Sequence, residues 1–191
     1  PTVKSPNPEN PEGFYLAVDL AKEVGSDLIL GTDPDSDRVG VMVRGADGEY
    51  HTITGNQMGV LLLDYIITAR RRKGTLPENA AAISTIVTSK MVRRICDVND
   101  IHFDETFTGF KFMAEKLAEY QRDGSYQYVL AFEESYGYMM GDYVRDKDAV
   151  TACVMITEMA AYYFEQGMTL AQALDALYEK YGFYGERTLN L

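Results

Sequence analysis

Three aspartates stand at alternate positions in one short segment, Asp33-Pro34-Asp35-Ser36-Asp37-Arg38. The segment follows directly on residues 27–32, an apolar run that predicts a short buried strand. Three carboxylates in a tight loop repel one another unless a cation lies among them, and such oxygen ligands suit a hard divalent ion, Mg²⁺ or Mn²⁺. We therefore predict a metal site formed by Asp33, Asp35 and Asp37.

Two other interpretations of the aspartates have to be weighed. An EF-hand calcium loop also begins with acids at positions 1, 3 and 5, but it needs Gly at position 6 and Glu at position 12. This chain has Arg38 and Arg44 there, which excludes an EF-hand. The structural alternative is a solvated acidic turn whose aspartates act as caps, although such turns rarely place three aspartates behind a buried strand.

A second polar segment, Glu133-Glu134-Ser135, lies where a strand predicted over 128–132 ends. Open α/β sheets bind ligands at the carboxyl ends of their strands, and carboxylate and hydroxyl groups in that position suit a polyol. Taken alone, the segment is also typical of an exposed polar turn.

Two further segments place basic residues near the starts of predicted helices. In 106–111, Gly109 and the free amides of the helix start are able to cradle an anion, and Lys111 adds charge. In 144–148, Arg145 and Lys147 precede a long helix with Asp148 as its N-cap, and a solvated charge run is the simpler interpretation. In an acidic chain, these cations are where a phosphorylated substrate finds positive charge.

The predicted elements place these segments at strand ends and helix starts. Asn10 as N-cap and Pro11 at the first position predict a helix that ends at Gly25, and a strand over 39–44 leads into a hairpin turn at 45–48. Beyond that turn helices and strands alternate. The predicted helices cover 55–73, 90–98, 109–120, 149–164 and 170–181, and the predicted strands cover 81–87, 101–106 and 128–132. This alternation predicts an α/β fold, with a mixed, mainly parallel sheet and helices on both faces.

Composition excludes several classes of protein. The chain of 191 residues is 46% hydrophobic and 25% charged, so disorder is excluded as its main state. A net charge of -11 argues against nucleic acid or an anionic membrane surface as partner. No apolar run approaches the about 18 residues that span a bilayer. Without a signal peptide and with only Cys96 and Cys153, far apart, we expect a cytoplasmic protein with two buried thiols.

The four segments, in this order, resemble the phosphoglucomutase/phosphomannomutase (α-D-phosphohexomutase) superfamily over nearly the whole chain. Residues 5–9 and 31–38 are similar to the end of that family's second domain, and residues 108–111, 132–135 and 145–148 are similar to motifs of its third domain. The resemblance implies that residues 1–48 are the C-terminal part of domain 2 with the metal-binding loop. Residues 49–191 would be the sugar-binding domain 3, with three α/β/α layers.

The resemblance also implies a role for each residue of the first segment. Asp33, Asp35 and Asp37 would bind the catalytic Mg²⁺, and Arg38 would help to hold the phosphoryl group near it. Lys147 is similar to a lysine that transfers a proton or stabilises charge, so Arg38 and Lys147 are the expected catalytic residues.

For the sugar, the resemblance implies that Glu133 and Ser135 hydrogen-bond its hydroxyl groups in either orientation. Thr108 and Gly109 belong to a neighbouring substrate loop. Two basic residues complete the expected substrate-binding set, Lys111 and Arg145.

The implied reaction moves phosphate between O1 and O6 of glucose through a hexose 1,6-bisphosphate, with hexose 1- and 6-phosphates as partners. Phosphoryl transfer depends mostly on positioning and charge neutralisation, so a metal, cations and hydroxyl-binding groups are its expected parts. Two alternatives remain open. One is a phosphopentomutase that acts on ribose or deoxyribose 1-phosphate, and the other is a non-catalytic metal- or phosphate-binding module.

The chain departs from the family in two respects. The serine that donates phosphate, in a Thr/Ser-Ala-Ser-His-Asn-Pro motif of domain 1, is absent, and Ser5 does not replace it because no His follows it. The fourth domain, which grips the distal phosphate, is also missing. We therefore expect an excised piece of a longer protein, catalytically inactive by itself and a weak binder of Mg²⁺.

Overall fold

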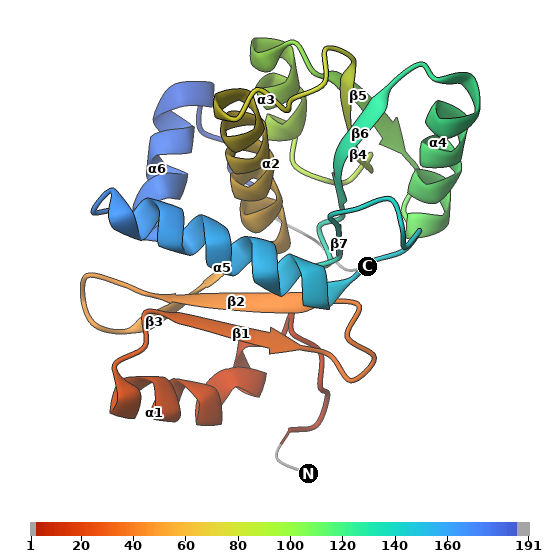
Figure 1. Cartoon of the computed structure of the whole chain (residues 1–191). Coiled ribbons are helices and arrows are strands. Elements are labelled where there is room, and N and C mark those ends of the chain that lie inside the picture. Colours follow the sequence, from red (N-terminus) through yellow and green to blue (C-terminus); the bar gives the residue numbers. More distant parts are fainter. Residues whose placement is uncertain (1–2, 187–191) are drawn as a thin grey trace.

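Residues 3–186 are described by a computed structural model (Figure 1). The strands are β1 (Leu28–Thr32), β2 (Val39–Arg44), β3 (Tyr50–Ile53), β4 (Ala80–Thr85), β5 (His102–Thr106), β6 (Gln127–Phe132) and β7 (Tyr138–Met139). The helices are the 3₁₀ turn η1 (Pro11–Phe14), α1 (Tyr15–Val24), α2 (Gly55–Arg72), α3 (Met91–Asn99), α4 (Phe110–Asp123), α5 (Ala149–Glu165) and α6 (Leu170–Tyr181). None of these helices is long and apolar enough to cross a membrane.

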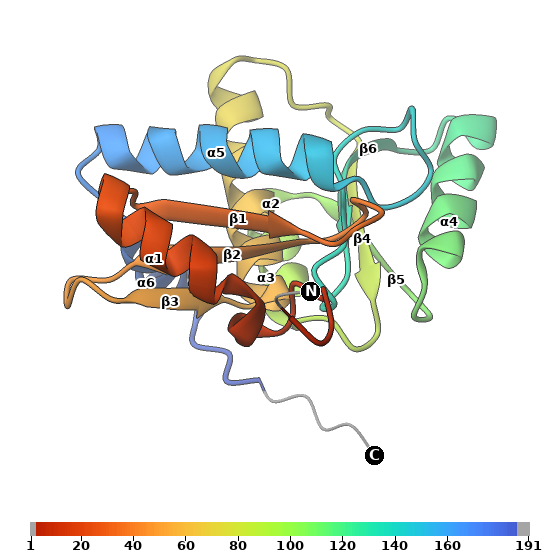
Figure 2. The same ribbon diagram turned by 90° about the horizontal axis from the view of Figure 1, so that it is seen from below.

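The first sheet is antiparallel and carries the aspartate segment at one of its turns. Its strand order is β1-β2-β3, and Thr32 pairs with Val39 at the end that leads into the segment. Alternate side chains point to opposite faces of a strand, and Ile29 and Met42 pack on one face with Phe14 and Ala21 of the η1–α1 segment. Figure 1 shows α1 on one side of this sheet and α5 on the other, and Figure 2 shows α1 in front of the strands.

The second sheet has the order β5-β4-β6-β7, in which β5, β4 and β6 are parallel and β7 is antiparallel to β6. Ala81 and Ile83 of β4 face α4, whereas Ala80 and Ala82 face the core that holds α2, α3, α5 and α6. The prediction of a mixed, mainly parallel sheet between helical layers is therefore confirmed for this part of the chain. The short strand β7 was not predicted, because a two-residue strand leaves no readable alternation.

Helix α5 joins the two sheets. Its buried residues Ala152, Ile156 and Met159 belong to the same apolar cluster as Val41 and Val43 of β2. The helix lies between the first sheet and α2 (Figure 1). A shared core of this kind fixes the turns of the first sheet relative to the strand ends of the second.

Several predicted helix caps are present in the structure, among them Asp148 at the start of α5. Thr54 and Gln57 form the predicted capping box at the start of α2, and Gly25 has the left-handed conformation that ends α1. The predicted N-cap at Asn10 is wrong. Its side chain caps nothing, residues 11–14 form a 3₁₀ turn, and the α-helix begins only at Tyr15.

The predicted domain boundary between residues 48 and 49 falls in the turn between β2 and β3. Strand β3 pairs with β2 and so completes the first sheet. The outer ends of the two predicted domains, residues 1–2 and 187–191, lie outside the described residues.

Candidate active site

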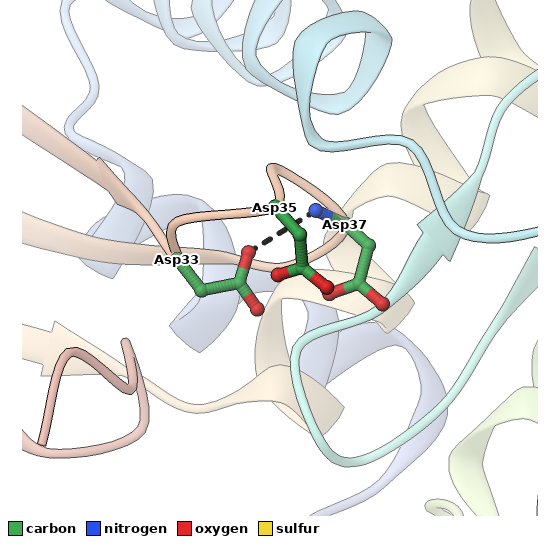
Figure 3. Close-up of side chains that lie close together, drawn as sticks. All are labelled: Asp33, Asp35 and Asp37. Atoms are coloured by element: carbon green, nitrogen blue, oxygen red, sulfur yellow. Dashed lines mark hydrogen bonds between the residues drawn. The ribbon is translucent and has the colours of Figure 1, made fainter.

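The three aspartates lie together in the turn between β1 and β2. One carboxylate oxygen from each of Asp33, Asp35 and Asp37 lies within 4.8 Å of the other two. Asp33 is buried, Asp37 is half-buried and Asp35 is exposed. Figure 3 shows the three carboxylates gathered on one side of the turn.

Hydrogen bonds of the backbone give the turn its shape. The N–H of Ser36 donates to the carbonyl oxygen of Asp33 at 3.1 Å, and Ser36 itself has a positive φ of 56°. The Oδ1 of Asp33 accepts the N–H groups of Asp37 and Arg38, each at 3.1 Å (Figure 3 draws the first). Asp33 therefore holds the loop in place as well as facing its centre.

Arg38 closes one side of the site. Its Nε donates to Oδ2 of Asp33 at 2.8 Å, and its terminal nitrogen lies 3.2 Å from Oε1 of Glu9. Burial disfavours the charged form of Asp33, but the hydrogen bonds from Arg38 and Asp37 outweigh it and lower the pKa of Asp33. Asp33 is thus held ionised although it is buried.

The loop that joins β6 to β7 lies against the aspartate loop. The N–H of Val39 donates to the carbonyl oxygen of Tyr136 at 3.1 Å, and Arg38 forms a single antiparallel bridge with Gly137. Tyr136, three residues after Glu133, has a positive φ of 66°. Ser36 stands in the same position after Asp33 and also has a positive φ. The two loops thus share a local backbone form and lie side by side.

Glu133 faces the space between these two loops. Its N–H donates to the carbonyl oxygen of Gly137 at 2.9 Å, which places its side chain next to Lys147. Burial raises the pKa of Glu133 to about 7, while the positive charge of Lys147 opposes this rise and the charge of Glu134 adds to it. Glu133 is therefore a carboxyl group that changes charge near neutral pH.

Lys147 reaches the aspartate loop from the segment that precedes α5. Its Nζ lies 2.9 Å from Oδ2 of Asp37 and 3.3 Å from Oδ1 of Asp146, and 5.2 Å above the ring of Phe110. Burial disfavours the ammonium, but the bond to Asp37 outweighs it and raises the pKa of Lys147. A stable ammonium therefore lies between the aspartates and Glu133.

Glycines allow the close approach of the elements around Glu133. A Cβ on Gly137 would lie 2.3 Å from Cδ of Lys147 and 2.7 Å from Oε1 of Glu133. A Cβ on Gly55 of α2 would lie 2.1 Å from the carbonyl oxygen of Glu134. Any larger residue at either position would displace the loop or the side chains that it presents.

Other predicted site residues lie outside this contact network. Thr108 and Lys111 are exposed, and the Lys111 ammonium lies 4.7 Å above the ring of Phe112. Gly109 precedes α4 with a φ of 110°. Arg145 is turned toward α4, where it donates to Oε1 of Gln121 at 2.7 Å. The structure thus gathers Asp33, Asp35, Asp37, Arg38, Lys147 and Glu133, whereas Lys111 contacts Phe112 and Arg145 contacts Gln121.

Glu134 and Ser135 have a different environment from Glu133. The Oε2 of Glu134 accepts the hydroxyl of Thr85 at 3.1 Å, and the hydroxyl of Ser135 lies 3.5 Å from Oε1 of Glu134. Thr85 ends β4, and Thr88 and Lys90 follow it in the same loop. This loop was not among the predicted site segments, although it follows a buried strand, as does the predicted segment after β6.

The donor set of the aspartate loop fits a hard divalent cation. All its side-chain ligands are carboxylate oxygens, which Mg²⁺ and Mn²⁺ prefer. Among the described residues, Oδ1 of Asp37 is buried and accepts no hydrogen bond. A buried oxygen without a donor is available to a metal ion.

Comparisons with known proteins point to one family. Residues 1–48 match the model of phosphoglucomutase/phosphomannomutase alpha/beta/alpha domain II, and residues 54–181 match that of domain III. The chain is 37% identical to a phosphopentomutase of Mus musculus, covering 96% of this chain and 30% of that protein. It is also 37% identical to a phosphoglucomutase of Staphylococcus aureus, covering 95% of this chain and 32% of that protein. The chain thus spans about a third of the length of these relatives.

Solved structures share the fold. A provisionally named phosphomannomutase of Thermus thermophilus matches with a TM-score of 0.72 and 22% identity, covering 93% of this chain and 36% of that one. N-acetylphosphoglucosamine mutase of Aspergillus fumigatus, solved with GlcNAc-6P and magnesium, matches with a TM-score of 0.59 and 13% identity, covering 84% of this chain and 36% of that one. The fold and the two family matches agree, and the chain belongs to the phosphoglucomutase/phosphomannomutase family.

Proposed function

We propose that this chain is the metal- and sugar-binding part of a Mg²⁺-dependent phosphohexomutase, which interconverts glucose 1-phosphate and glucose 6-phosphate through a bisphosphate. The observation that carries the proposal is the meeting of two loops at Lys147, with Asp37 on one side and Glu133 on the other. A phosphoryl group bound at the aspartates would then lie next to the groups that bind its sugar.

In this proposal Asp33, Asp35 and Asp37 hold the magnesium ion, which when bound neutralises charge on the phosphoryl group. Arg38 is fixed by Asp33 and Glu9, and it directs its remaining N–H groups toward a phosphate oxygen. The A. fumigatus mutase, which shares the fold, was solved with magnesium and a phosphosugar, which supports these two kinds of ligand for the proposed site.

Glu133 and Ser135 are proposed to accept and donate hydrogen bonds to sugar hydroxyls. With a pKa of about 7, Glu133 is able to accept in its ionised form and donate in its protonated form near neutral pH. Thr108, Gly109, Lys111 and Arg145 are proposed to lie along the path of the substrate, with Lys111 and Arg145 supplying positive charge for the distal phosphate.

A phosphopentomutase is the second candidate. The observation in its favour is that the mouse phosphopentomutase and the bacterial phosphoglucomutase are equally identical to this chain. Both activities would use the same metal loop and the same basic residues, so the two candidates differ in the sugar alone.

The 191-residue chain by itself is proposed to be inactive and to bind Mg²⁺ weakly. It spans about a third of its relatives, and the phosphate-donating serine motif is not in its sequence. A cytoplasmic location is part of the proposal, and the two free cysteines, Cys96 and Cys153, suit a reducing compartment.

The test is a mutase assay on a full-length protein that carries this segment, with Mg²⁺ and an activating sugar bisphosphate. We expect the highest kcat/KM with glucose 1-phosphate, compared with the 1-phosphates of mannose and ribose. A preference for ribose would replace the hexose assignment by the pentose one. No turnover of any sugar would contradict both.

A non-catalytic binding module is separated from an enzyme by Glu133→Ala in the same full-length protein. An enzyme should lose at least about tenfold in kcat/KM, because Glu133 is proposed to hold the sugar in both orientations. Binding of inorganic phosphate should stay unchanged. A module that binds only metal and phosphate would show no turnover before or after the substitution.

A further inference from the structure

Lys147 forms an ion pair with Asp37, one of the three aspartates of the proposed metal loop. Its Nζ lies 2.9 Å from Oδ2 of Asp37, and its side chain is 18% exposed. The lysine stands in the segment before α5, more than a hundred residues from Asp37 in the sequence. The contact is therefore a tertiary one, between the segment that precedes α5 and the aspartate loop of the first sheet.

Two cations, Arg38 and Lys147, lie against Asp33 and Asp37. Arg38 donates its Nε to Asp33 at 2.8 Å and lies 3.6 Å from Asp37. Lys147 neutralises Asp37 from the opposite side. The loop is thus stabilised without a metal by one fixed guanidinium and one ammonium, of which the ammonium has the more flexible stem.

We propose that Lys147 competes with the divalent cation for Asp37, so that binding of the cation displaces the ammonium from the aspartate loop. The inference rests on the proposed metal site. Lys147 bonds one carboxylate oxygen of Asp37 and leaves the other without a donor, so the competition arises from charge: a divalent cation bound at Asp37 and the ammonium would be two positive charges a few ångströms apart in a partly buried site, where they repel each other.

The surroundings of Lys147 determine where the displaced ammonium goes. Asp146 lies 3.3 Å from its Nζ, and the ring of Phe110 lies beneath it at 5.2 Å. The Cδ of Lys147 and Oε1 of Glu133 both lie close to Gly137, so the Glu133 carboxyl is also within reach of the lysine side chain. The displaced ammonium therefore has two acids beside it, Asp146 and Glu133.

This coupling is reciprocal by thermodynamic linkage. A cation that binds Asp37 makes Lys147 available to an anionic ligand. An anionic ligand that draws Lys147 away makes Asp37 available to the cation. Lys147 is in this respect a positioning residue between the two halves of the site.

The experiment measures Mn²⁺ binding by the 191-residue chain, through the EPR signal of free Mn²⁺. We expect Lys147→Gln to lower the dissociation constant about tenfold, because the competing charge is gone. Lys147→Arg keeps the charge and should stay within about threefold of the wild type. Lys22→Gln makes the same change of net charge at an exposed pair with Glu49 and should have no effect.

Asp35→Asn shows whether the signal comes from the proposed site, since it should abolish binding. Equal affinity of the wild type and Lys147→Gln, with binding lost in Asp35→Asn, would overturn the competition and leave the metal site standing. Weaker binding by Lys147→Gln would overturn it as well. Binding by neither protein would contradict the metal site and the inference together. Circular dichroism of each variant confirms that it is folded.

Discussion

The N–H of Val39 donates to the carbonyl oxygen of Tyr136 at 3.1 Å, and this bond ties the aspartate loop of one sheet to the glutamate loop of the other. A second bond, from the N–H of Ala149 to the carbonyl oxygen of Ser36 at 3.0 Å, ties the same loop to the start of α5. Both use backbone groups, so the spacing between the metal and sugar sides of the site does not depend on side-chain rotamers.

Asp33 and Asp35 should respond differently to substitution by asparagine. Asp33 is buried and accepts three hydrogen bonds, one of them from the Arg38 guanidinium, so Asp33→Asn should lower the free energy of unfolding by about 2 kcal/mol. Asp35 is exposed, and Asp35→Asn should change that free energy by less than about 0.5 kcal/mol. Urea denaturation in EDTA measures both values.

Mn²⁺ binding by the same two variants completes the comparison. Both should lose it, because each removes a charged ligand from the same loop. If Asp35→Asn kept full affinity, Asp35 would be no more than a solvated turn residue.

Gly59 of α2 should not tolerate even alanine. Its Cβ would lie 2.0 Å from the ring of Phe132, which is buried at the end of β6. The gain in helix propensity is about 1 kcal/mol, but the clash should exceed it and leave a net loss of about 2 kcal/mol in the free energy of unfolding. Gly13→Ala is the matched control, because nothing lies within 4 Å of its Cβ. Equal stability of the two variants would show that α2 can move away from β6.

The stability of the metal-free chain should depend on pH through Glu133. Its pKa rises from 4.5 in the unfolded chain to about 7 in the folded one, so the folded state holds the proton more tightly. The protonated Glu133 therefore contributes fully to the free energy of unfolding below about pH 4.5, and this contribution is lost as the pH rises through 7. The glutamine of Glu133→Gln does not titrate. The free energy of unfolding of this variant, relative to that of the wild type, should therefore increase by about 2 kcal/mol between pH 5 and pH 8.

Thermal or urea unfolding at the two pH values measures this difference. The control is Glu115→Gln, at an exposed position on α4, whose difference from the wild type should be the same at both pH values. If the difference in free energy of unfolding between Glu133→Gln and the wild type were also the same at both pH values, the Glu133 carboxyl would be as well solvated as that of Glu115.

Gly137→Ala should reproduce part of the effect of removing Lys147. The new Cβ would lie 2.3 Å from Cδ of Lys147, so the lysine stem has to move and its ion pair with Asp37 lengthens. Mn²⁺ affinity should therefore rise by a few-fold. A double variant with Lys147→Gln should show no further gain, and additive gains would mean that Gly137 acts by another route.

Much of the local structure was predictable because its causes lie close together in the sequence. The capping box of Thr54 and Gln57 spans three residues and was predicted correctly, as were the hairpin turn after β2 and the bounds of α6. The start of α1 was predicted wrongly, because Pro11 and Asn10 suit a 3₁₀ turn as well as the first turn of an α-helix.

The acidic loop was likewise readable from the chain, since alternate aspartates directly after a strand have few other uses. The prediction that this strand is buried was wrong, because only Ile29 of β1 is buried. The sequence could not show that Glu133 would be a half-buried carboxyl with a raised pKa and Glu134 a partner of Thr85, because adjacent glutamates look alike until a fold surrounds them. Nor did it show that Arg145 turns toward Gln121 while Lys147, two residues on, reaches Asp37.

The sequence by itself determined most of the elements, the family resemblance and the residue types available for chemistry, since these follow from local spacing and motif order. Only the tertiary structure decided which of those residues meet. Two sheets share one core through α5, and that packing brings Asp37, Glu133 and Lys147 to one place from three separate segments. Contacts between such distant positions depend on the packing of the whole chain, which no local pattern records.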